Sequence, residues 1–180
     1  MCSSDLEAVG TGFNRSDAWV NTFITDLNEK FRNQANDALA VDARIEFYLA
    51  LRNPSNNSTT SINRVNGTTA DPNYAATGYT NANGDNLRAL SIWPKEKYLN
   101  IWIINKFQSG IGGFGNYPGD ETYNGTVMTG NYYSLTVHEL GHIFNLAHTF
   151  EGDNANANCP ADNNCLVDGD MVCEDRKSVV

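Results

Sequence analysis

Residues 138–148 read His138-Glu139-Leu140-Gly141-His142-Ile143-Phe144-Asn145-Leu146-Ala147-His148, and this stretch decides how the rest of the chain is interpreted. Its first five residues form an H-E-x-x-H pattern. Side chains four positions apart lie on the same face of an α-helix. The imidazoles of His138 and His142 can therefore bind one metal ion, with Glu139 beside them to hold a water molecule. The chain has three histidines, and all of them lie in this stretch.

The position of His148 predicts that the helix ends before it. A straight helix would place His148 about 280° around the axis from His138 and roughly 15 Å along it, too far away to share the ion. Asn145 lies where the chain must turn, and asparagine tolerates positive φ and caps helix ends. A valine or isoleucine at this position would be damaging. We therefore expect the chain to reverse at Asn145 and to bring the three histidines together.

Three neutral imidazoles with a fourth position open to water are typical of catalytic zinc. We predict that His138, His142 and His148 are the zinc ligands. Zinc lowers the pKa of a bound water towards about 7, and Glu139 is predicted to act as the catalytic general base on that water. For the short H-E-x-x-H pattern alone, a helix that carries two histidines by chance is the alternative.

The chain resembles a known family in and around this stretch. Residues 135–150 resemble the active-site segment of pappalysin-type metzincins, especially the cytophagalysin-like bacterial members, which often carry asparagine at the position of Asn145. Weaker similarity covers the following stretches: 45–50, 62–64, 98–102 and 169–173. The resemblance implies a metzincin fold with a twisted mixed β-sheet, a backing helix and an active-site helix.

The resemblance also implies a function. It predicts a secreted zinc endopeptidase that hydrolyses peptide bonds through a zinc-bound water activated by Glu139, with a protein or peptide substrate lying along an edge strand. One alternative is a non-catalytic zinc-containing binding domain of a secreted protein, although binding alone has no use for Glu139. Another is a zinc aminopeptidase, but those normally take a distant glutamate as third ligand, a role that His148 fills here.

The composition excludes other classes of function. The chain has 180 residues, of which 41% are hydrophobic, and a formal net charge of −9. This size suits one domain, and the acidic balance argues against binding nucleic acid or an anionic membrane. No apolar run is long enough for a transmembrane helix. The abundance of Asn, Gly, Ser and Thr is typical of a loop-rich extracellular protein.

The hydrophobic pattern predicts an α+β domain. The expected elements are a helix from Asp17 to about Asn36, strands over 44–50, 62–65 and 98–105, and a helix over 131–145. The strand over 98–105 is apolar on both faces and is expected at the centre of the sheet. Residues 72–86 are expected to form a loop. Residues 112–117 lie in a Gly-rich segment that can supply the substrate-binding rim, although a plain surface loop is equally compatible.

Both ends of the chain are expected to be non-native. Residues 1–6 and 175–180 resemble translated sequencing-adapter sequence, which leaves 7–174 as a partial metzincin-type catalytic domain. The Met-containing turn of metzincins and the tyrosine that follows it in pappalysins are not found, and Met171 does not match that turn. We therefore expect most of the lower subdomain to be missing and the fragment to be poorly active.

Two further features follow the third histidine. Cys159, Cys165 and Cys173 favour one local disulfide with one cysteine left over, the alternatives being free thiols or a zinc site. Clustered oxygen ligands in a loop suit calcium, which several relatives in the resembled family require, although a solvated acidic loop is the ordinary explanation. The acidic residues of this cluster are Glu151, Asp153, Asp162, Asp168 and Asp170.

Overall fold

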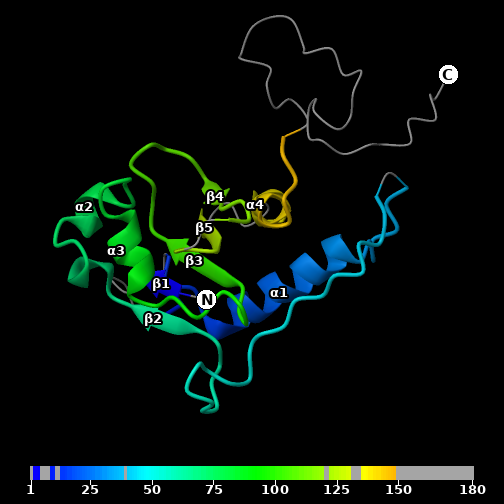
Figure 1. Ribbon diagram of the computed structural model, residues 1–180, viewed down its shortest axis with the longest axis horizontal. Helices are drawn as coiled ribbons and strands as arrows, with labels where there is room; N and C mark the ends of the chain where they lie inside the picture. Colours follow the sequence, from blue (N-terminus) through cyan, green and yellow to red (C-terminus); the bar gives the residue numbers. More distant parts are fainter. Residues whose placement is uncertain are drawn as a thin grey trace, which may run out of the picture.

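The computed structural model of the chain contains a five-stranded sheet with helices on both faces (Figure 1). The structure describes residues 2–4, 9–10, 13–38, 40–119, 122–130 and 135–148. The strands are β1 (Cys2–Ser4), β2 (Asn63–Val65), β3 (Asn100–Ile104), β4 (Gly113–Gly115) and β5 (Gly125–Thr129). The helices are α1 (Asp17–Phe31), α2 (Tyr74–Thr77), α3 (Gly84–Ala89) and α4 (Thr136–Ile143), with a 3₁₀ turn at Gly67–Thr69.

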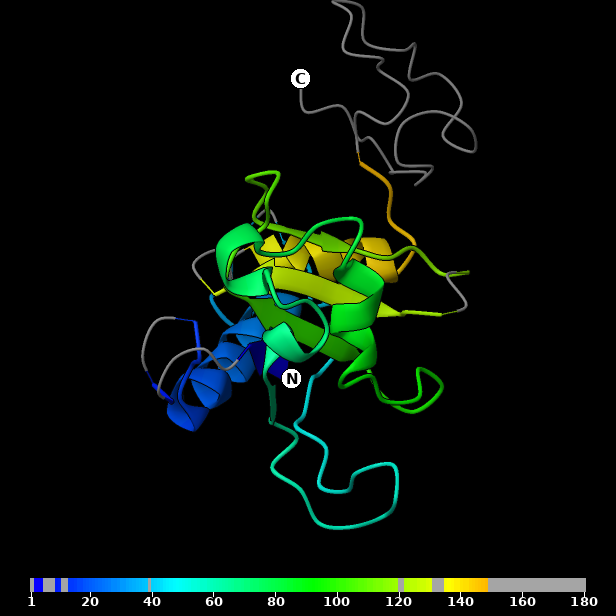
Figure 2. The same ribbon diagram turned by 90° about the vertical axis from the view of Figure 1, so that its left-hand side faces the viewer.

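The sheet is mixed and has the strand order β2-β1-β3-β5-β4. Its neighbouring strands run parallel, except that β4 at one edge is antiparallel to β5. Helices α1 and α4 cover one face, and the short helices α2 and α3 cover the other (Figures 1 and 2). This arrangement confirms the predicted α+β class.

Strand β3 lies at the centre of the sheet and is buried along its whole length, as predicted. Ile101 and Ile103 pack with α1 and α4, whereas Trp102 and Ile104 pack with α2 and α3. Successive side chains of a strand point to opposite faces, so an apolar run such as this one holds two cores together.

Helix α1 begins as predicted and ends earlier than predicted. The Ser16 side chain accepts a hydrogen bond from the backbone N–H of Trp19 at 3.2 Å, which caps the first turn. The predicted end was near Asn36, but the helix ends at Phe31. Asn33 and Asn36 both have positive φ, at 46° and 53°, and this left-handed backbone conformation does not continue an α-helix.

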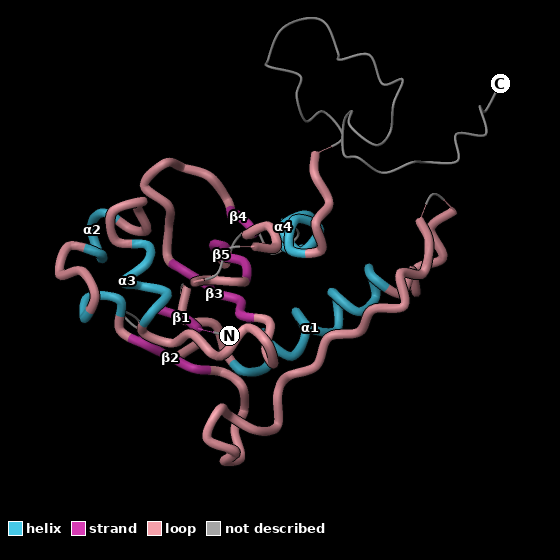
Figure 3. Tube along the Cα trace, in the orientation of Figure 1, coloured by secondary structure: helices cyan, strands magenta, loops and turns pink. Residues whose placement is uncertain are grey.

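The prediction of a strand over 44–50 was wrong. The chain between α1 and β2 is irregular (Figure 3), because side chains of α1 take up its backbone groups. The Asn28 side chain accepts from the Phe47 N–H at 2.7 Å and donates to the Phe47 carbonyl oxygen at 3.0 Å. These are two backbone groups that a sheet neighbour would otherwise bind.

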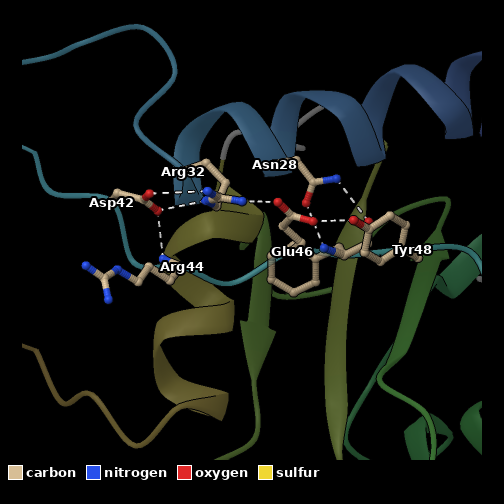
Figure 4. A network of polar contacts seen from close by, with 7 residues as sticks. Asn28, Arg32, Asp42, Arg44, Glu46 and Tyr48 are labelled. Atoms are coloured by element: carbon tan, nitrogen blue, oxygen red, sulfur yellow. Dashed lines mark hydrogen bonds and ion pairs between the residues drawn. The ribbon is translucent and has the colours of Figure 1, made fainter.

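Charged groups hold the part of this segment before Phe47 to the C-terminal end of α1 (Figure 4). Arg32 Nε lies 2.8 Å from Asp42 Oδ1, which also accepts from the Arg44 N–H at 2.8 Å. The hydrogen bond from Arg32 holds the pKa of Asp42 below its ordinary value. Arg32 also pairs with Glu46, which accepts from the Tyr48 hydroxyl. The segment therefore lies along α1 through side-chain contacts instead of a strand ladder.

The prediction of a loop over 72–86 was also wrong in part, because this region contains α2 and the start of α3. Asparagine and aspartate side chains support the turns around them: Asp71 accepts from the Asn73 N–H at 2.9 Å, and Asn83 accepts from the Thr80 N–H at 2.8 Å. Helices of one or two turns carry too few residues to show a periodic apolar pattern. Strand β5 was not predicted, whereas β2 confirms the short strand expected at 62–65.

Strand β1 comes from the segment expected to be non-native, and it pairs in parallel with β2 and β3. Backbone pairing of this kind depends little on side-chain identity, so it does not test that prediction. Within the described residues, no helix combines the length and the apolar character needed to span a membrane.

We predict that Asn28→Ala destabilises the fold. The substitution removes both hydrogen bonds to Phe47 and leaves its backbone groups half-buried without those partners, which costs about 1–2 kcal/mol in free energy of unfolding. Chemical denaturation measures this cost. Asn21→Ala, at an exposed position of the same helix, is the matched control and should change the value by less than about 0.5 kcal/mol. Equal effects of the two variants would contradict the role assigned to Asn28.

Candidate metal centre

Helix α4 carries the first two histidines and is fixed to the sheet by its apolar side. Leu140 is fully buried against β3, β5 and α1, and burial of a leucine side chain contributes about 2 kcal/mol. His138 and His142 share the side of the helix away from Leu140, as their spacing requires. The sheet therefore determines the direction in which both imidazoles point.

Helix α4 ends at Ile143, two residues earlier than the helix predicted over 131–145, and the hydrogen-bonded turn that follows has its reversal at the predicted residue. Asn145 has φ of 68°. Its N–H donates to the His142 carbonyl at 2.9 Å, and the Leu146 N–H donates to the Gly141 carbonyl at 2.9 Å. This pair of bonds is the Schellman arrangement, in which a left-handed residue closes the helix. The prediction that the chain reverses at Asn145 is confirmed.

The turn brings the third histidine back to the first two. The Nε2 atom of His138 lies 3.1 Å from Nε2 of His148 and 3.1 Å from Nε2 of His142. The three ligand atoms all lie within 4.8 Å of one another. Two nitrogens 3.1 Å apart, each about 2.0–2.1 Å from one ion, would subtend an angle of about 100° at that ion, close to tetrahedral. The spacing of these two pairs, together with the three-imidazole donor set, is compatible with zinc.

A carbonyl oxygen sets the tautomer of His142. Nδ1 of His142 lies 2.8 Å from the Leu146 carbonyl oxygen. The oxygen can only accept, so Nδ1 carries the proton and the Nε2 lone pair faces the other two imidazoles. Hydrogen bonds of this kind orient histidine ligands in metal sites. The same turn that recruits His148 therefore also orients His142.

The site is open on one side. His142 is buried, His148 is half-buried and His138 is exposed. A bound ion would thus be held from the protein side and remain accessible from solvent, as a catalytic metal with an open coordination position requires.

Glu139 lies next to His138 on α4, on the side that meets the edge strand. Its side chain is buried, at 7% exposure. A Cβ atom built at Gly113 would lie 3.6 Å from Glu139 Cγ, and one at Gly115 would lie 2.2 Å from the Glu139 carbonyl oxygen. The two glycines therefore let β4 lie directly against the helix. As expected for a rim, β4 is the last strand at this edge of the described sheet.

One contact of the site was not predicted. The ring of Tyr117 packs against that of His142, with centroids 5.0 Å apart and an interplanar angle of 48°. The alternation Gly113-x-Gly115-x-Tyr117 was the signal that could have found it, because a strand that presents two glycines to α4 presents its next side chain there as well.

Several predicted features lie outside the described residues. These are the cysteines at 159, 165 and 173, the acidic cluster at 151, 153, 162, 168 and 170, and Met171. The disulfide and the calcium site therefore stay predictions.

Comparison with known proteins agrees with this geometry. Residues 81–178, more than half of the chain, match the peptidase family described as Pregnancy-associated plasma protein-A. No curated protein sequence matches the chain. Among solved structures, mature mirolysin from Tannerella forsythia in complex with a cleaved peptide is 24% identical to this chain. The match covers 97% of this chain and 68% of the mirolysin chain, with a TM-score of 0.71.

Two further structures of the same relative match. Mirolysin in complex with compound 9 is 28% identical over 85% of this chain and 64% of its own, with a TM-score of 0.61. A mutant of Tannerella forsythia promirolysin is 25% identical over 83% of this chain and 55% of its own, with a TM-score of 0.64. The chain thus spans less than two thirds of the length of the chain in these two structures. The mixed sheet with its backing and site helices matches the metzincin fold of mirolysin.

We predict that Asn145→Val weakens metal binding and Asn145→Gly does not. A β-branched side chain at positive φ costs about 1–2 kcal/mol, so the turn opens and His148 leaves the other imidazoles. Competition with a chromogenic chelator measures zinc affinity for both variants. Wild-type affinity in the valine variant would show that the turn does not position His148.

Gly115→Ala is expected to separate β4 from α4. The new Cβ would lie 2.2 Å from a backbone oxygen, which cannot rotate away, so the edge strand must shift at a cost of about 1–3 kcal/mol. Thermal unfolding reports this loss. In the control Gly141→Ala the new Cβ would lie 3.8 Å from Leu146 Cδ1, an ordinary contact, and stability should be unchanged or slightly raised.

Proposed function

The chain belongs to the pappalysin family of metzincin metalloproteases, and on that premise we propose that it is part of a secreted zinc endopeptidase. One observation carries the proposal: three imidazole Nε2 atoms converge from a single helix and the turn after it. The Asn- and Gly-rich composition of the chain supports the proposal that the protein is secreted.

His138, His142 and His148 would hold zinc through their Nε2 atoms. When bound, zinc polarises the scissile carbonyl and makes a water molecule acidic enough to react at neutral pH. The Leu146 carbonyl keeps the proton of His142 on Nδ1, so that Nε2 is free for the ion. The exposed side of His138 leaves an approach for the substrate.

Glu139 would move the protons of the reaction. Its carboxylate adjoins the first ligand on α4 and is shielded from bulk water by β4. In this role it accepts a proton from the attacking water and delivers it to the nitrogen of the leaving amine. A non-catalytic zinc-binding domain has no use for a buried carboxylate at this position, which favours the protease.

The substrate is proposed to bind as an additional strand. Strand β4 lies at the edge of the sheet and runs alongside α4 (Figure 1). An extended peptide can pair with the backbone of such an edge, and this pairing depends little on sequence. The solved structure of mature mirolysin is of a complex with a cleaved peptide, which supports a peptide substrate for this chain as well.

We predict that Glu139→Gln retains zinc and loses activity. Glutamine has nearly the same shape but cannot take a proton, so turnover of a peptide substrate should fall by at least about 100-fold. Zinc content by atomic emission and cleavage of a quenched fluorescent peptide measure the two effects. Glu96→Gln, at an exposed turn position, is the matched control and should behave as wild type.

Metal removal completes the test. Treatment with a zinc chelator should abolish cleavage, and added zinc should restore it. Turnover of the Glu139→Gln variant within a few-fold of wild type would end the assignment of the base. A wild-type chain that binds zinc and cleaves no peptide would instead favour the non-catalytic binding domain.

A further inference from the structure

The rim segment, residues 113–117, presents its side chains alternately to two sides of the sheet. Gly113 and Gly115 face Glu139 of α4. Phe114 packs into the core under α2 and α3, and Asn116 binds Arg88 of α3. The ladder continues past β4, since the Asn116 N–H donates to the Gly125 carbonyl at 3.2 Å.

Because the two preceding positions on the helix side are glycines, Tyr117 supplies the first side chain of the rim segment that α4 meets. That side chain lies against His142, with ring centroids 5.0 Å apart. Tyr117 is 42% exposed, so its ring has one side on the imidazole and another towards solvent at the mouth of the site.

His142 is thus restrained from two directions. The Leu146 carbonyl fixes the Nδ1 side of the ring within its plane, and the Tyr117 ring limits its tilt from the rim side. An imidazole held in both ways keeps its Nε2 lone pair directed at one point, which is what a metal ligand requires.

The rim segment is anchored by Arg88 on the face of the sheet that α2 and α3 cover. Arg88 is buried and donates to Asn116 Oδ1 at 3.1 Å and to Asp85 Oδ1 at 2.6 Å. Its guanidinium lies 4.2 Å from the centroid of the Tyr123 ring. Asn116, the residue next to Tyr117, is therefore held to α3. This restrains the backbone from which the Tyr117 ring packs against His142.

We propose that Tyr117 is a positioning residue of the metal centre, which holds the His142 imidazole in its ligating orientation. The proposal rests on the proposed zinc site. It assigns the effect to the aromatic ring, because the contact is between rings, and not to the hydroxyl group.

The test compares Tyr117→Ala, Tyr117→Leu and Tyr117→Phe in the full chain, with zinc and cobalt(II) as probes. We expect Tyr117→Ala to lower zinc affinity by about tenfold, as loss of an orienting contact around a metal ligand does, and to change the visible absorption spectrum of the cobalt form. Tyr117→Phe keeps the ring and should match wild type in both measurements. Tyr117→Leu should lie between them.

Tyr48→Ala is the matched control, because Tyr48 is an exposed tyrosine on the segment along α1. It should leave zinc affinity and the cobalt spectrum unchanged. Circular dichroism checks that each variant is folded; Tyr117 is exposed enough for all three to be tolerated.

Two results would overturn the proposal. One is a Tyr117→Ala variant with wild-type zinc affinity and an unchanged cobalt spectrum. The other is a raised KM for a peptide with both metal measurements unchanged, which would show that the ring acts on the substrate alone. Loss of metal affinity in Tyr117→Ala, when the wild type binds zinc and cleaves no peptide, would support the positioning role and favour the non-catalytic binding domain over the protease, so the two failures are distinguishable.

Discussion

The hydrogen bond from His142 Nδ1 to the Leu146 carbonyl holds the candidate metal centre together. It forms only because α4 ends at Ile143 and the chain reverses through Asn145. The same reversal returns His148 to within 3.1 Å of His138. Helix termination, tautomer choice and recruitment of the third ligand are therefore consequences of one backbone conformation, and a change in any of them changes the others.

The sheet gives this turn a fixed base. Side chains of β3 and β5 bury Leu140, so α4 cannot rotate without opening the core that it shares with α1. On the opposite face, Arg88 ties α3 to the rim next to β4. The metal centre thus sits between a helix anchored to one core and a rim anchored to the other. Well-packed supports of this kind hold catalytic groups in place without cost at the moment of reaction.

The site could be predicted from the sequence more completely than the fold. The spacing of His138, His142 and His148 demanded a turn, and Asn145 was a residue able to make it, so local chemistry was sufficient. Strand β3 was also predictable, because an apolar run on both faces has few other places in an α+β domain. In both cases the decisive information lies within about ten residues.

Two of the errors came from interactions between distant residues. The segment over 44–50 alternates like a strand, yet Asn28, 19 positions before Phe47, binds its backbone. The contact of Tyr117 with His142 joins residues that only the sheet brings together. Helices α2 and α3 depend on asparagine side chains that are equally common in loops, and composition alone does not distinguish the two.

The glycines of β4 have a consequence for how such a site can diversify. With no side chain between them, rim and helix touch through backbone atoms at Gly115 and Glu139, and a substitution at Gly115 can only widen their separation. Side chains beside this contact come from the neighbouring positions, of which Tyr117 is the nearest on the helix side. The distance between the rim and the candidate metal centre thus has a lower limit set by backbone contact, and changes in the side chains beside that contact leave the limit as it is.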